Sequence, residues 1–325
     1  MRKKMPSIHS GFVGLIFFLF FALSVNNTAF SQTTPEEAVE LWNLRQTKIQ
    51  QFYQEGNLEG ALNSAQEAVS LAETAFGSGS LETISSLLLQ AQIHSEMDQL
   101  EEANQIYQVT LETSVASFGE SDATTLSVLD NYGEFLNSID PEMAEPVFQE
   151  ALQLSSEDDP QRASRMKAVG LNLLELGRII EAEGMLKQAL KTFKEISGEK
   201  NTEALSAMAS LAQLYMSQGK LKHAQELFET ALPMMLESLD DTSFLILESK
   251  ENLAEIYRQQ GKYSQAETLF LQSMKAAEAE YGEEDPLVVQ AKSHLAQLYE
   301  DTGKLKQALA FHQQVYEIDS ELLGE

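Results

Sequence analysis

The chain has 325 residues and carries 22 Lys and Arg against 50 Asp and Glu, for a formal net charge of −28. A surface this acidic repels nucleic acid and anionic lipid headgroups, so we expect neither as a partner. Cysteine is absent, which excludes disulfides, thiolate metal ligands and a cysteine nucleophile.

Residues 1–31 have the composition of a cleavable signal peptide. Three basic residues at 2–4 precede an apolar run of 15 at 11–25, and small residues stand at 29 and 31. We therefore expect cleavage before Gln32 and an exported protein, periplasmic or secreted, with no insertion into the membrane after cleavage. The alternative is an uncleaved anchor, although a spanning helix needs roughly 20 apolar residues.

A repeat of about 42 residues fills the rest of the chain. An alanine recurs in seven units with spacings of 42, 41, 38, 42, 42 and 42, at Ala61, Ala103, Ala144, Ala182, Ala224, Ala266 and Ala308. Each of the last four alanines follows five residues after a glycine, at Gly177, Gly219, Gly261 and Gly303. A period of this length is typical of a solenoid, a fold that usually holds other molecules.

The unit from Thr242 to Gly282 shows the local structure that the repeat predicts. Apolar residues at helical spacing predict one amphipathic helix over 243–259 and a second over 263–281. Gly261 lies in the turn between them, where a left-handed conformation can end a helix. The small alanines of the two helices allow the helices to approach closely.

These motifs resemble those of the tetratricopeptide repeat, in particular its longer kinesin-light-chain-like variant. Residues 253–257 read LAEIY and residues 261–263 read GKY, and LAQLY recurs at 211–215 and 295–299. The resemblance covers about residues 35–325. It implies an all-α fold, a right-handed α-α superhelix of about seven helix pairs. It also implies a concave groove for peptide or protein ligands, and neither catalytic activity nor a cofactor.

The array divides in composition near Pro160. Residues 32–160, with repeats 1–3, hold two basic and 24 acidic residues, a net charge of −22. Residues 161–325, with repeats 4–7, hold 17 basic and 26 acidic residues, a net charge of −9. We interpret these as two sub-blocks with a hinge where the spacing falls to 38; the alternative is a shortened loop without mechanical meaning.

Charge suggests two kinds of interaction. The acidic surface favours a basic partner, although acidic runs at turns also serve solubility alone. Repeat 4 is the exception, because Lys187, Lys191 and Lys194 fall on one face of its second helix. That face could dock an acidic surface, including another copy's N-terminal half, or it is simply a solvated helix face.

The resemblance implies that the first helix of each pair lines the groove. Counting back from each repeat's alanine gives an inward set rich in amides and carboxylates, with Lys167 and Arg258 as the main basic residues: Gln50, Gln92, Asn131, Glu134, Gln213, Glu251, Asn252, Glu255, Gln290, His294 and Gln297. Asn131 and Asn252 match the position where the family's peptide binders often place asparagine. The basic clamp for a terminal carboxylate is missing, and a groove rich in Glu and Gln suits segments with Lys or Arg.

Motifs for chemistry are lacking in the sequence. There is no Walker loop, no G-x-S-x-G and no G-x-G-x-x-G. The four histidines after the leader stand singly, so we expect no catalytic residues and no metal site: His94, His223, His294 and His312.

We therefore expect an exported, non-catalytic scaffold or adaptor that binds protein or peptide. One alternative is a regulatory or targeting subunit of a separately encoded envelope enzyme. Another is a self-associating array, since the last helix carries apolar residues that a following repeat would cover: Phe311, Val315, Tyr316, Ile318, Leu322 and Leu323.

Overall fold

A computed structural model describes residues 33–323, with side-chain surroundings up to Ser320. The predicted leader and its cleavage site lie outside the described residues. The described part contains fourteen α-helices and no strand: α1 (Pro35–Gln54), α2 (Leu58–Phe76), α3 (Leu81–Glu96), α4 (Leu100–Phe118), α5 (Ala123–Ile139), α6 (Pro141–Leu154), α7 (Arg162–Glu175), α8 (Ile179–Ser197), α9 (Thr202–Ser217), α10 (Leu221–Ser238), α11 (Phe244–Gln259), α12 (Tyr263–Tyr281), α13 (Pro286–Asp301) and α14 (Leu305–Leu323).

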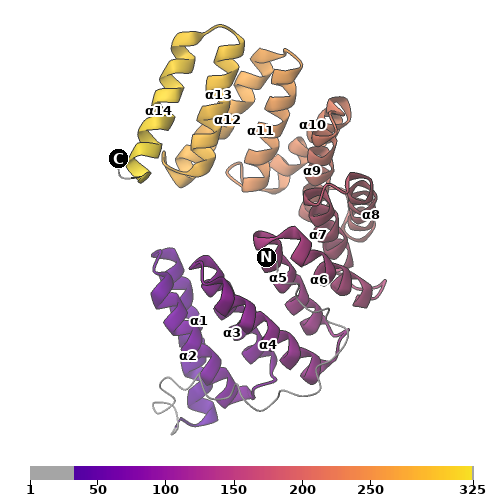
Figure 1. The fold of residues 1–325 in the computed structure, drawn as a ribbon, viewed down its shortest axis with the longest axis vertical. Helices are drawn as coiled ribbons and strands as arrows, with labels where there is room; N and C mark the ends of the chain where they lie inside the picture. Colours follow the sequence, from indigo (N-terminus) through magenta and orange to yellow (C-terminus); the bar gives the residue numbers. More distant parts are fainter. Residues whose placement is uncertain (1–32, 324–325) are drawn as a thin grey trace, which may run out of the picture. The chain divides into compact units, whose positions relative to one another are not determined.

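The helices form consecutive antiparallel pairs, as the repeat predicts (Figure 1). The expected helices at 243–259 and 263–281 are observed as α11 and α12. The all-α solenoid of about seven helix pairs is therefore confirmed. None of the described helices has the length and apolar character needed to cross a membrane.

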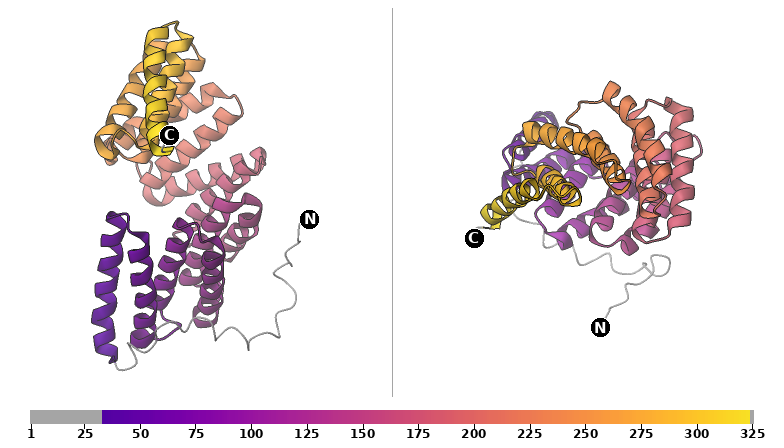
Figure 2. Two further views of the ribbon diagram at one scale, coloured as in Figure 1. Left: turned by 60° about the vertical axis from the view of Figure 1, so that its left-hand side comes forward. Right: turned by 90° about the horizontal axis from the view of Figure 1, so that it is seen from above.

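The chain divides into two compact units, Met1–Gly119 with α1 to α4 and Glu120–Glu325 with α5 to α14. This division differs from the sub-blocks proposed from composition, because Pro160 lies inside the second unit, where α6 packs against α7. Charge composition does not report packing, so the two divisions need not coincide. In the second unit each helix pair packs on the next, and the pairs follow one another from magenta to yellow (Figure 2).

The turn between the paired helices depends on a left-handed residue. Gly261 has φ +72°, and the next amide, of Lys262, donates to the carbonyl of Tyr257 over 2.8 Å. This reversal places Ala254 and Ala266 in fully buried contact positions. In the second repeat the corresponding residue is Asp98, with φ +58°, a conformation that costs a non-glycine residue free energy.

The tyrosine that ends the LAEIY or LAQLY motif of a repeat forms a hydrogen bond with the preceding repeat. The Tyr257 hydroxyl donates to Glu229 on α10 over 2.7 Å, and the Tyr299 hydroxyl donates to Glu267 on α12 over 2.8 Å. The lysine of the following turn lies over each ring, with Lys262 5.2 Å from the ring centroid of Tyr257. These tyrosines are buried structural residues, as the sequence indicates.

The short connection at Pro160 is held by buried arginine. Arg165 is 4% exposed, and its guanidinium reaches Asp130 of α5 at 2.9 Å and Asp159 of the connection at 2.6 Å. Burial raises the pKa of Asp130, although the hydrogen bonds and charge of Arg165 oppose that shift. Arg162 also donates to the carbonyl of Leu152 at the end of α6 over 2.9 Å. The predicted hinge at this place stays a prediction.

Candidate ligand-binding face

Side chains join the first helices of successive repeats in the second unit. Lys167 of α7 bonds to Glu203 of α9 over 2.9 Å, and Gln213 of α9 donates to Glu248 of α11 over 2.8 Å. We call the surface formed by α5, α7, α9, α11 and α13 the ladder face. Because polar residues recur there at the repeat period, this surface is held in shape by its own hydrogen bonds.

On the ladder face, side-chain contacts also join α11 to α13. His294 Nδ1 lies 3.1 Å from Glu251 Oε2, and Arg258 pairs with Asp301 of α13. Arg258 also forms an ion pair with Glu255 of its own helix, with Nε 2.7 Å from the carboxylate. Arg258, predicted as a groove cation, is thus already committed to two carboxylates.

A cavity of about 200 Å³ opens between α11 and α13 on this face. It brings together five residues of the predicted inward set: Glu251, Asn252, Glu255, Gln290 and His294. Three further lining residues, Phe244, Glu248 and Leu287, were missed by counting back from the repeat alanine. Glu248 and Leu287 stand a turn nearer their helix N-termini, and only the packing of two repeats shows that they face one cavity. We call it the α11–α13 pocket.

Burial affects the pKa values of the glutamates in this pocket. Glu251 is 7% exposed and accepts hydrogen bonds from the Ser273 hydroxyl at 3.1 Å and from His294. Burial raises the pKa of Glu248, and the nearby charge of Glu251 raises it further, against the lowering effect of the Gln213 hydrogen bond. Burial also acts to raise the pKa of Glu255, but hydrogen bonds from Arg258 and Gln259 leave it lowered.

The remaining predicted residues lie outside this pocket. Asn131 on α5 donates to the carbonyl of Ser127 in its own helix over 2.8 Å, and Glu134 is exposed one turn further along. Gln297 is exposed on α13, whereas Gln213 is half-buried against Glu248. Gln50 and Gln92 are exposed in the first unit.

No cluster of three or more His, Asp or Glu in the described part of the chain is arranged to hold a metal ion. The three glutamates that line the α11–α13 pocket follow one another along α11. Such an arrangement suits an extended polar ligand better than a single ion.

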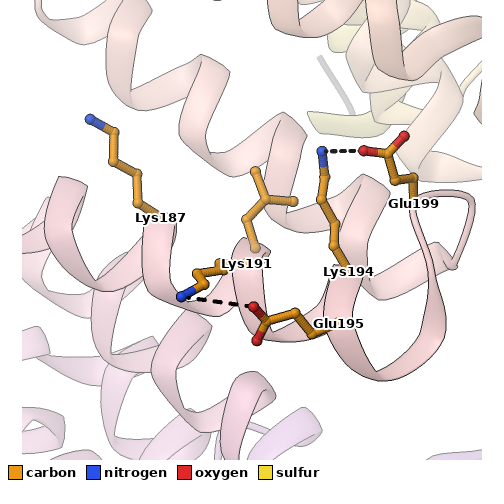
Figure 3. Close-up of a pocket in the computed structure, with 6 residues that line it drawn as sticks. Lys187, Lys191, Lys194, Glu195 and Glu199 are labelled. Atoms are coloured by element: carbon orange, nitrogen blue, oxygen red, sulfur yellow. Dashed lines mark hydrogen bonds and ion pairs between the residues drawn. The ribbon is translucent and has the colours of Figure 1, made fainter.

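The predicted lysine face of α8 forms a second, shallower hollow of about 440 Å³ (Figure 3). Each lysine there has a carboxylate partner nearby: Lys191 lies 3.7 Å from Glu195, and Lys194 lies 3.2 Å from Glu199. Lys187 pairs with Glu183 at 2.6 Å. The pairs are largely exposed and balance the lysine charge, as expected for a solvated helix face.

An all-α solenoid of helix pairs, with a polar face on its first helices, defines a class of proteins that hold ligands along a surface. A sequence profile of the tetratricopeptide repeat family matches residues 161–237 and 245–321. No curated protein sequence matches the chain.

Three solved structures share the fold. BtubC (BKLC) from P. vanneervenii has 16% identity and TM-score 0.57 over 74% of this chain and 93% of that chain. A tetratricopeptide repeat protein from Parabacteroides merdae ATCC 43184 has 16% identity and TM-score 0.56 over 86% and 93%. A Rap protein complexed with Competence and Sporulation Factor has 18% identity and TM-score 0.58 over 87% and 76%.

The second unit of the chain therefore carries tetratricopeptide repeats. The family generally provides protein-binding scaffolds.

Proposed function

We propose that this chain is an exported, non-catalytic scaffold that binds a segment of a protein or peptide on the ladder face of its second unit. The α11–α13 pocket carries the proposal. It joins the amides of Asn252 and Gln290, which can both donate to and accept from a peptide backbone, with carboxylates and an apolar rim. The structurally similar Rap protein is complexed with Competence and Sporulation Factor, so a fold of this kind can hold a ligand.

Charge favours a basic segment as the ligand. The pocket is lined by three glutamates and by no lysine or arginine, and the chain as a whole carries a net charge of −28. Long-range attraction would steer a basic segment toward the surface and raise its association rate. A separately encoded enzyme of the cell envelope is one class of partner that such a scaffold could position.

Export is the second part of the proposal and rests on the leader alone. Cell fractionation with N-terminal sequencing tests it directly: the mature chain should begin at Gln32 and should be found outside the cytoplasm. A chain that keeps Met1 and stays in the cytoplasm would contradict export without touching the binding proposal.

Self-association through α14 is a second candidate. Its observed basis is apolar exposure, with Leu305 68%, Leu309 58% and Tyr316 70% exposed; the side chains of Leu322 and Leu323 lie outside the described residues. If α14 mediates contact between copies, Leu309→Glu with Tyr316→Glu should convert an oligomer to a monomer in sedimentation. A wild-type chain that is monomeric at tens of micromolar would exclude it.

The binding proposal is tested by capture from envelope extract with the tagged mature chain (residues 32–325). The comparison bait carries Asn252→Ala and Gln290→Ala, and a control bait carries Gln188→Ala and Gln272→Ala on second helices. We expect a partner that elutes at moderate salt from the wild type and the control and is lost from the comparison bait. Equal capture by all three baits would contradict the ladder face as the binding surface.

A further inference from the structure

We infer that the α11–α13 pocket receives an arginine side chain of the bound segment. The inference rests on the proposed function and specifies the chemistry that one subsite recognises. It is carried by three observations: carboxylates without a lysine or arginine partner, their spacing along α11, and an exposed aromatic ring at the rim.

The first observation concerns charge. Among the described residues, no lysine or arginine pairs with Glu248 or Glu251, whereas Glu255 is paired with Arg258. Glu251 is more than nine-tenths buried, and the ionisable group paired with it in the described part of the chain is the imidazole of His294. A buried carboxylate without a full cation costs free energy, and an incoming cation that hydrogen-bonds to it offsets that cost.

The second observation concerns shape. Glu248 and Glu251, which have no lysine or arginine partner among the described residues, stand about one helical turn apart on α11, a rise of about 4.5 Å. They do not converge into a metal site in the described part of the chain. Two carboxylates at this spacing can both accept from one guanidinium, which has five N–H donors in a planar fork, more readily than from the point charge of an ammonium.

The third observation separates arginine from lysine further. Phe244, the first residue of α11, is 57% exposed and lines the pocket together with Leu287. A large exposed aromatic ring beside carboxylates can stack on the flat face of a guanidinium, while the apolar pair covers the aliphatic stem. The amides of Asn252 and Gln290 remain on the pocket wall for the backbone of the segment.

A peptide selection followed by a double-mutant cycle tests the inference. Random 12-residue peptides are selected on the mature chain at physiological salt, and each enriched peptide is measured by fluorescence anisotropy with its arginines replaced one at a time by citrulline or lysine. Citrulline keeps the shape of arginine and removes its charge. We expect one arginine whose change to citrulline weakens binding by about tenfold or more, with lysine intermediate.

Protein variants locate that arginine. In Glu248→Gln the citrulline change should cost less than about threefold, because the two changes remove the same interaction. Glu284→Gln, an exposed carboxylate in the turn before α13, removes the same charge and should leave the citrulline cost unchanged. Phe244→Ala should lower the preference for arginine over lysine. Circular dichroism confirms that each variant is folded.

The outcomes separate the inference from the proposed function. Peptides that lose affinity on Asn252→Ala with Gln290→Ala but tolerate citrulline at every position would overturn the arginine subsite and leave ladder-face binding intact. Equal effects of Glu248→Gln and Glu284→Gln would show diffuse attraction to an acidic surface and would also overturn it. Enriched peptides that are insensitive to every ladder-face variant, or no enriched peptide, would overturn both.

Discussion

His294 of α13 and Glu251 of α11 are 43 residues apart in sequence and meet on the ladder face, with Nδ1 3.1 Å from Oε2. The imidazole also lies against Phe270, with ring centroids 5.2 Å apart. Both residues line the α11–α13 pocket, and their contact joins the two helices that form it.

Replacing His294 should destabilise the fold more than replacing an exposed histidine. His294→Phe would leave the buried Glu251 with one hydrogen bond fewer, which should cost about 1–3 kcal/mol in the free energy of unfolding. His312, half-exposed and 3.1 Å from Glu300, is the control, and His312→Phe should change stability by less than about 0.5 kcal/mol. Equal urea denaturation midpoints for the two variants would show that the His294–Glu251 contact contributes no stability.

Removing the charge of Glu248 should stabilise the protein at neutral pH. Burial raises the folded-state pKa of this carboxyl, so it penalises the folded state wherever it is ionised. Glu248→Gln should therefore have a higher denaturation midpoint than the wild type at pH 7. The difference should shrink as the pH falls through the raised pKa, because the wild-type group then becomes neutral. A variant that is less stable at pH 7 would contradict this assignment.

The tyrosines that form hydrogen bonds between repeats should make the folded protein lose stability at alkaline pH. Burial, followed by the hydrogen bond and charge of Glu229, raises the pKa of Tyr257 from its ordinary value of 10.0 to about 12. A raised folded-state pKa contributes stability that is present below pH 10 and lost as the pH rises from about 10 toward 12. Stability should therefore fall over this window, and less steeply in Tyr257→Phe.

At neutral pH, the stability of the same variant measures the contribution of the Tyr257–Glu229 hydrogen bond. Tyr257→Phe should cost about 1 kcal/mol, because Glu229 loses a donor. That carboxylate has a pKa lowered by hydrogen bonds from Tyr257 and Gln225, so the cost should be present near pH 7 and fade as the pH falls through the lowered value. Tyr263→Phe, at the exposed start of α12, is the control and should have little effect.

Two glycines should respond oppositely to alanine. Gly261 has φ +72° in the turn before α12, and Gly261→Ala should cost about 1–2 kcal/mol although no atom lies within 4 Å of the added Cβ. Gly184 lies within α8 with open space around its Cβ, and Gly184→Ala should stabilise by about 0.4–1 kcal/mol. Thermal denaturation of both variants checks the signs, and a loss in both would contradict the assigned backbone conformation at Gly184.

The buried arginine near Pro160 should be essential to the second unit. Arg165→Met would leave Asp130 and Asp159 without their shared cation and should cost about 3–5 kcal/mol. Arg178→Met removes a solvent-facing arginine that pairs with Glu145 and Glu181 and should change stability far less. Similar small losses in both variants would mean that the connection at Pro160 is loosely held, as the predicted hinge requires.

The helices were predictable because the residues that determine each helix and its ends lie close together in the sequence. Apolar spacing and the turn at Gly261 place α11 and α12 within a residue or two of their observed bounds. The unit boundary at Gly119 was not predictable, because charge composition changes at Pro160 without any break in packing.

The site was predictable only in part. The repeat register places Asn252 and His294 correctly on facing helices, since the resemblance fixes which helix lines the groove. It could not show that Arg258 is held by Asp301, 43 residues away, or that Phe244 and Glu248 complete a pocket. Those contacts depend on how neighbouring repeats pack, which a single repeat does not contain.

The most direct test of the account is hydrogen–deuterium exchange of the mature chain with and without its captured partner or a selected peptide. If the ladder face binds the ligand, slower exchange should be concentrated in α11 and α13, and Asn252→Ala with Gln290→Ala should abolish it. Protection confined to α8 or to the exposed side of α14, with α11 and α13 unchanged, would contradict the central claim.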